Sequence, residues 1–112
     1  MAAVLENQVT KESIGDKRER YLAHSENLMV VVIDFEDGPC DQPDEPHSHP
    51  HEQITYVARG ELLFFLDGVE TRLAEGDVFV IPPDVPHSIQ PISNHVRLVD
   101  SFSPIRDDFL SD

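Results

Sequence analysis

The sequence lacks the features of several protein classes. Cys40 is its only cysteine, so no intrachain disulfide can form, which fits a reducing compartment. No apolar run approaches the roughly 20 residues that span a bilayer, and residues 1–20 lack the apolar centre of a signal peptide. Only 8 Lys and Arg stand against 22 Asp and Glu, a formal net charge of −14. This charge repels nucleic acid and anionic lipid, so we expect the protein to bind neither. The single cysteine and the missing export signal predict a cytoplasmic protein.

The chain that remains has the pattern of one small β-protein. Its 112 residues suffice for a single hydrophobic core, and 9 prolines divide it into short segments. Short apolar or alternating runs separated by turn residues are typical of a sandwich or barrel and predict one all-β domain. The predicted strands are 28–35, 53–58, 61–66, 70–73, 77–81, 85–90 and 95–102.

The first part of the chain shows no sustained helical or strand period. We therefore expect residues 1–27 to form an N-terminal segment that packs on the barrel or on a partner subunit. Residues 28–112 would form the barrel itself.

Histidines recur at every second position in the run HSHPHEQ, which holds His47, His49, His51 and Gln53. If the backbone is extended there, these side chains point to one side. Neutral imidazole nitrogens gathered in this way form a metal site, and the alternative is a solvent-facing histidine-rich loop. His87 follows a proline-rich turn and could reach the same interior, although such a histidine taken alone is more often an ordinary turn or core residue.

The histidine run resembles the first motif of the cupin superfamily. It reads His47-x-His49-x3-Gln53-x6-Gly60. Two departures are the glutamine in place of the usual glutamate and the missing glycine upstream of His47.

The segment before His87 resembles the second cupin motif. It reads Gly76-x5-Pro82-x-Asp84-x2-His87, with Asp84 in place of a glycine and Pro91 in place of the final asparagine. The two motifs together imply a jelly-roll β-barrel with a metal inside its mouth. The resemblance implies one divalent ion held by four ligands: His47, His49, Gln53 and His87.

The glutamine changes the chemistry expected of that ion. A neutral Gln53 leaves the full double charge on the ion, which makes a stronger Lewis acid and disfavours oxidation of the metal. Zinc or nickel is therefore favoured over redox-active iron or manganese, without the metal being identified. His51 has the same parity as the ligands and could replace one of them, but we expect it beside them, whereas Glu52 should face outwards.

A second group of candidates lies near the C-terminus. Asp100 alternates in phase with apolar residues, so its carboxylate should face inwards, as a general acid or base or as a rim residue. Arg106 could fold back to pair with Asp100, bind a substrate carboxylate, or remain a surface cation.

These segments together also resemble the pectin-degradation cupins that linearise 4,5-unsaturated uronates. That resemblance implies an anionic sugar substrate and catalytic or substrate-binding roles for Asp100, Phe102 and Arg106. The alternatives are a cupin dioxygenase and a non-enzymatic cupin that binds a small molecule. A homodimer is expected, through edge strands or swapped N-terminal segments.

Overall fold

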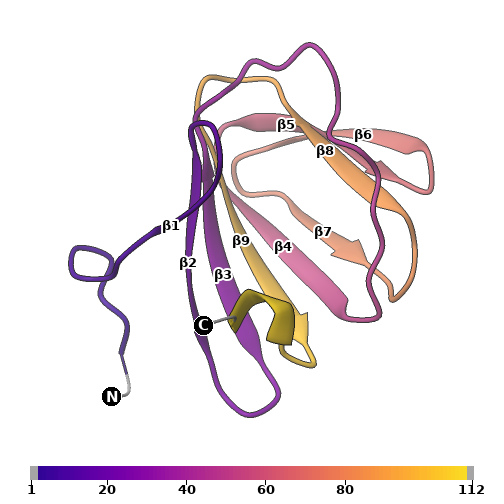
Figure 1. Ribbon diagram of the computed structural model, residues 1–112. Coiled ribbons are helices and arrows are strands. Elements are labelled where there is room, and N and C mark those ends of the chain that lie inside the picture. The colour runs from indigo at the N-terminus through magenta and orange to yellow at the C-terminus, as the bar shows by residue number, and fades with distance from the viewer. Residues whose placement is uncertain (1–2, 111–112) are drawn as a thin grey trace.

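Residues 3–110 form nine strands and one short 3-10 helix in this computed structural model (Figure 1). Residues 1–2 and 111–112, the outer ends of the two predicted segments, lie outside the described part of the chain. The elements are β1 (Glu12–Gly15), β2 (Arg18–His24), β3 (Met29–Phe35), β4 (Glu52–Arg59), β5 (Glu61–Leu66), β6 (Val69–Ala74), β7 (Val78–Ile81), β8 (His87–Pro91), β9 (Val96–Ser103) and the helix η1 (Asp107–Leu110).

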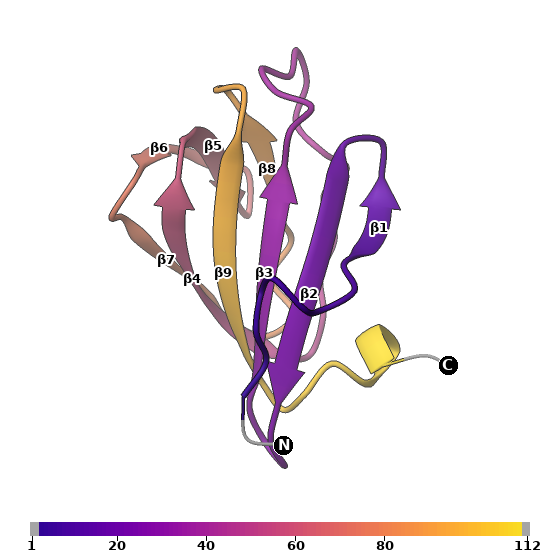
Figure 2. The ribbon, with the colours of Figure 1, turned by 90° about the vertical axis from the view of Figure 1, so that its left-hand side faces the viewer.

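The strands form two antiparallel sheets. The larger has the order β1-β2-β3-β9-β4-β7, and Figure 2 views its outer face. The smaller has the order β6-β5-β8. All seven strands predicted between residues 28 and 102 are present, which confirms the all-β prediction.

The main core lies between the inner faces of the two sheets. It combines residues of β3, β4, β7 and β9 in the large sheet with residues of β5 in the small sheet. The rings of Phe64 on β5 and Phe79 on β7 stack with centroids 4.2 Å apart. A second cluster joins Met29, Val31 and Phe102 at the end of the large sheet where η1 lies. Among residues 3–110, no helix is long and apolar enough to cross a membrane.

Two strands, β1 and β2, lie where the sequence shows no strand period. The reason is visible in β2, whose inward positions include two arginines. The guanidinium of Arg18 lies 4.9 Å from the centre of the Phe35 ring, and that of Arg20 lies 3.8 Å from the centre of the Phe109 ring. Because these cations pack against aromatic rings, β2 can join the sheet without an alternation of apolar and polar residues.

Candidate metal site and cavity

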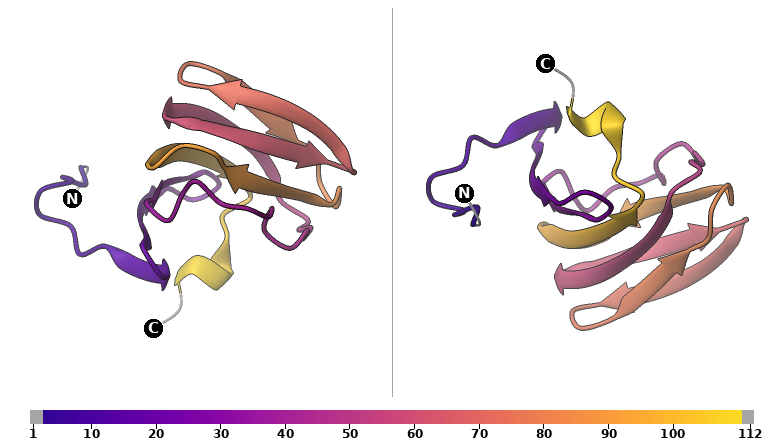
Figure 3. Two further views of the ribbon diagram at one scale, coloured as in Figure 1. Left: turned by 90° about the horizontal axis from the view of Figure 1, so that it is seen from above. Right: turned by 90° about the horizontal axis from the view of Figure 1, so that it is seen from below.

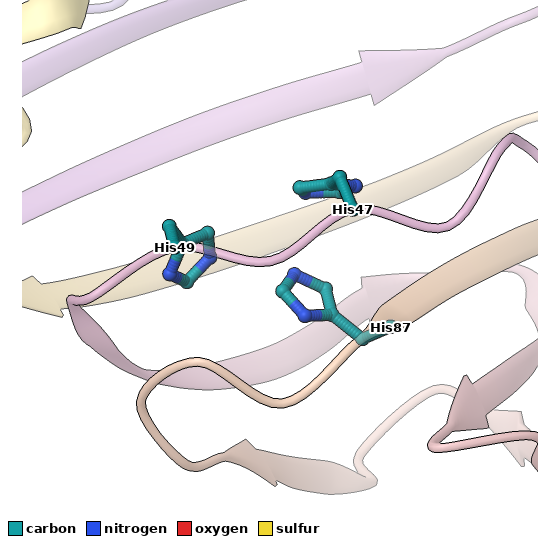
Figure 4. Close-up of side chains that lie close together, drawn as sticks. All are labelled: His47, His49 and His87. Carbon is teal, nitrogen blue, oxygen red and sulfur yellow. The ribbon is translucent and has the colours of Figure 1, made fainter.

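Three imidazoles converge at one mouth of the barrel (Figure 4). His47 and His49 come from the segment between β3 and β4, and His87 is the first residue of β8. One nitrogen of each ring lies within 4.8 Å of the others. Reciprocal backbone hydrogen bonds between His47 and His87, of 3.0 and 2.9 Å, hold two of the three residues side by side.

Unusual backbone positions connect the two motifs. Asp84 has a φ of 65°, a left-handed conformation that glycine adopts without strain and that aspartate tolerates. Its amide then donates a 2.8 Å hydrogen bond to the carbonyl of His49. Gly60 has a φ of 86°, and a Cβ there would collide with the carbonyl oxygen of His95. The substitution of Asp84 for glycine therefore preserves the turn that holds His49.

Hydrogen bonds to the backbone fix two of the rings in the form that binds metal. His49 Nδ1 lies 2.9 Å from the carbonyl of His51, and His87 Nδ1 lies 2.9 Å from the carbonyl of Val85. Since a carbonyl only accepts, Nδ1 carries the proton and Nε2 is free to coordinate. Burial lowers the pKa of His87 to about 4. The pKa of His49 is also lowered, mainly by burial and to a smaller extent by the positive charge of Arg106.

The oxygen of Gln53 completes a donor set that fits a divalent cation. Gln53 Oε1 lies 3.1 Å from His49 Nε2, and both side chains are buried. In the neutral ring assigned above, both atoms are acceptors with no proton between them. A cation satisfies such a pair, and imidazole nitrogen with amide oxygen suits zinc, nickel and related ions. The geometry of the residues therefore fits the predicted metal.

A chain of hydrogen bonds links this site to Asp100. The amide nitrogen of Gln53 donates to Thr55 Oγ1 at 2.8 Å, and the Thr55 hydroxyl donates to Asp100 Oδ1 at 2.7 Å. Asp100 is 6% exposed, and this burial raises its pKa to about 6 despite the hydrogen bonds that oppose the shift. Its carboxyl group can therefore both give and take a proton near neutral pH.

A cavity of about 210 Å³ opens beside these residues. It is smaller than the roughly 300–1,000 Å³ typical of drug-sized ligands and suits a compact molecule. Its lining includes three of the candidate metal ligands, the carboxyl group of Asp100, Arg106 and two aromatic rings. The residues are His47, Gln53, His87, Asp100, Phe102, Arg106 and Phe109. The guanidinium of Arg106 lies over the rings of Phe102 and Phe109, at 5.3 and 4.2 Å from their centres.

The structure brings all the predicted site residues to this cavity region but differs from the sequence analysis in two respects, the partner of Arg106 and the role of Thr55. Arg106 does not pair with Asp100; it forks onto Asp108 with contacts of 3.1 and 2.8 Å. His51 lies beside the three-imidazole cluster, as expected, with its ring centroid 5.7 Å from that of His49 and its carbonyl accepting the hydrogen bond of His49 Nδ1. Thr55 was missed, although it shares with Gln53 the inward face of β4.

Comparisons with known proteins agree with this geometry. The cupin domain family matches residues 28–101. The pectin degradation protein KdgF of Dickeya dadantii (strain 3937) is 31% identical over 108 residues, which are 95% of this chain and 96% of that protein.

Two solved structures share the whole fold. An RmlC-like cupin from Shewanella frigidimarina NCIMB 400 superposes with a TM-score of 0.87 at 34% identity, covering 97% of this chain and 96% of that one. KdgF from Halomonas sp. gives a TM-score of 0.85 at 32% identity, covering 94% of each chain.

Proposed function

This chain belongs to the cupin family, and we propose that it is a metal-dependent enzyme that converts 4,5-unsaturated monouronates into linear 5-keto-4-deoxyuronates. One observation carries the proposal. The candidate ligand Gln53 and the buried Asp100 line the same cavity and are joined through Thr55. The similarity to a pectin degradation protein supports this substrate class.

The reaction needs a proton at C4 and water at C5. A divalent ion held by His47, His49, Gln53 and His87 would supply a Lewis acid for substrate oxygen atoms. The carboxyl group of Asp100 gives its proton to C4, and water adds at C5 as Asp100 takes a proton back. The hemiketal hydroxyl proton then moves to the ring oxygen while the C5–O bond breaks. This leaves a ketone at C5 and a hydrated aldehyde at C1.

Two further residues would position the sugar. Arg106 uses one side of its guanidinium for Asp108, and its remaining N–H groups can bind the substrate carboxylate. Phe102 is buried, lines the cavity, and lies edge-on to the imidazole of His49 with a centroid distance of 5.7 Å. Its ring forms an apolar wall against which the sugar ring can rest.

The decisive experiment follows the ultraviolet absorbance of an unsaturated monouronate in the presence of protein and added zinc, nickel, manganese or iron. We expect the wild type to accelerate its decay, and Asp100→Asn to lower the rate by about 10²–10⁴-fold, the usual contribution of general acid–base catalysis. His49→Ala should also lose activity. His24→Ala changes an exposed histidine outside the site and should leave the rate unchanged.

The alternatives give different results in the same assay. A dioxygenase would consume oxygen and require iron or manganese, whereas the proposed reaction proceeds without oxygen. A binding protein would retain affinity for the sugar while decay continued at the spontaneous rate. Either result would refute the proposed reaction and leave the metal site standing.

A further inference from the structure

The wall of the cavity holds a charged pair that the proposed reaction does not use. Asp44 and Arg18 both line the cavity, and Arg18 donates to both carboxylate oxygens of Asp44, at 2.8 and 3.1 Å. Arg18 also donates a 3.0 Å hydrogen bond to Asp37, which is not part of the cavity lining. Because the contact between Arg18 and Asp44 is bidentate, it holds the Asp44 carboxylate in one orientation.

Backbone hydrogen bonds set the distance between Asp44 and the candidate metal ligands. The loop between β3 and β4 runs beside β8, an edge strand of the small sheet (Figures 1 and 3). The amide of His47 donates to the carbonyl of His87 at 3.0 Å, and the amide of Asp44 donates to the carbonyl of Ile89 at 2.9 Å. Because these carbonyls are two residues apart on one strand, Asp44 lies about 7 Å further along β8 than the histidines. A single sugar ring fits between groups at this spacing.

The two ends of this spacing differ in charge. At the histidine end the candidate ligands are neutral, so a divalent ion would keep its double charge there, and Arg106 adds further N–H donors. At the other end the carboxylates of Asp37 and Asp44 outnumber the single guanidinium of Arg18. The carboxylate of a ligand is therefore favoured at the histidine end and disfavoured beside Asp44.

The free acceptor sites of Asp44 suit hydroxyl groups. A carboxylate only accepts hydrogen bonds, and each oxygen of Asp44 has a second lone pair that Arg18 does not use. The side chain of Asp44 is 39% exposed, so a ligand in the cavity can reach it.

In an unsaturated monouronate, the hydroxyl groups on C2 and C3 lie across the ring from the carboxylate on C5. We infer that Asp44, held in place by Arg18, binds the C2 and C3 hydroxyl groups of a monouronate whose carboxylate lies at the histidine end. The inference rests on the proposed function and makes Asp44 the residue that selects a hydroxylated ring.

Calorimetric titration of the nickel-loaded chain tests the inference with two acids that cannot undergo the ring opening. Galacturonate has the ring, the carboxylate and the hydroxyl groups, whereas tetrahydropyran-2-carboxylate has only the ring and the carboxylate. The wild type should bind galacturonate about 10–100-fold more tightly, as expected for hydrogen bonds to a charged group. Asp44→Ala should lower the affinity for galacturonate by this factor and should not lower the affinity for tetrahydropyran-2-carboxylate.

Asp37→Ala is the matched control. It removes the other carboxylate that contacts Arg18, and therefore the same charge, from a position outside the cavity lining. The ratio of the two affinities should stay at its wild-type value. Circular dichroism of both variants should match the wild type.

Three results would overturn the inference. The first is a wild type that does not prefer galacturonate. The second is an equal loss of affinity for both acids in Asp44→Ala, which would give Asp44 a structural role only. The third is the same selective loss in Asp37→Ala, which would trace the preference to overall charge. The ring-opening assay is independent of these measurements. Selective binding of galacturonate without ring opening of the unsaturated sugar would refute the proposed function and leave the role of Asp44 standing.

Discussion

The hydroxyl group of Thr55 links the candidate metal ligand Gln53 to the buried carboxyl group of Asp100. It accepts from the Gln53 amide and donates to Asp100, and its side chain is fully buried. The direction of these bonds decides which way the Gln53 amide faces. With its nitrogen bonded to Thr55, the amide oxygen must point towards His49 and the proposed metal position.

Thr55→Val should therefore weaken metal binding without changing a ligand. We expect about a 10–100-fold loss of nickel affinity, typical when a group that orients a metal ligand is removed. The free energy of unfolding should fall by about 1–3 kcal/mol, because buried polar groups lose their partner. Calorimetric titration and chemical denaturation measure the two effects. Thr55→Ser should keep wild-type affinity, and Thr71→Val, at an exposed threonine of β6, should change neither quantity. A Thr55→Val protein with unchanged nickel affinity would contradict the role assigned to this hydroxyl.

The metal itself should stabilise the fold. An ion that binds only the folded chain adds about 2.7 kcal/mol when its concentration is 100 times its dissociation constant. In a domain of this size, removal of the ion by a chelator should lower the Tm by about 10–15 °C. Differential scanning calorimetry with chelator and with re-added nickel or zinc measures this shift. His87→Ala should show no response to either, while His24→Ala should respond like the wild type.

At the scale of elements, β3 and β9 are joined at one end by a cluster of charged groups around the buried carboxylate of Asp34. Asp34 accepts hydrogen bonds from Arg97 at 3.0 and 3.1 Å and lies 2.7 Å from His95 Nε2. Glu6 contacts the outer side of Arg97. Burial alone would raise the pKa of Asp34, but the hydrogen bonds from Arg97 and His95 outweigh it and the pKa is lowered.

This lowered pKa predicts loss of stability in acid. Because the folded pKa lies below the unfolded value of about 3.9, Asp34 stabilises the protein above that pH. The contribution disappears as the pH falls from about 4 through the lower, folded pKa. Asp34→Asn should flatten this part of the profile and cost about 1–3 kcal/mol at pH 7. Urea denaturation between pH 3 and pH 7, at one protein concentration, measures both effects. The control Glu36→Gln, at an exposed neighbour of β3, should retain the wild-type slope.

The elements also show what the sequence could and could not predict. The alternation of apolar and polar residues, together with the turn residues between the runs, predicted β3 to β9, because strand positions that face the core are apolar and tight turns require particular residues. β2 escaped detection because Arg18 and Arg20 occupy inward positions under aromatic rings. Spacing identified His49 and His87, but the bond between Thr55 and Asp100 joins residues 45 positions apart and leaves no local pattern. Arg106 pairs with Asp108, two residues away, and not with Asp100, the partner that the sequence suggests.

For the whole molecule, the net charge of −14 would oppose the capture of the proposed substrate, an anionic sugar. Attraction to the proposed substrate would have to come from groups inside the cavity, chiefly Arg106 and the proposed ion, and it would act over a short distance. Repulsion by the acidic surface acts over a longer distance at low salt, where the Debye length is about 30 Å at 0.01 M. Salt should therefore screen the repulsion more than it screens the attraction within the cavity.

This balance predicts that kcat/KM for an unsaturated uronate rises with ionic strength. Between about 0.01 and 0.2 M salt we expect an increase of less than tenfold, since the screened interaction is weak and long-range. The methyl ester of the same sugar carries no charge, so its rate should not change with salt, whatever its absolute value. Initial rates at saturating metal measure both dependences. A steep fall in kcat/KM for the acid would instead mean that a positive field around the cavity mouth dominates capture, and Arg106→Gln should then abolish the salt dependence.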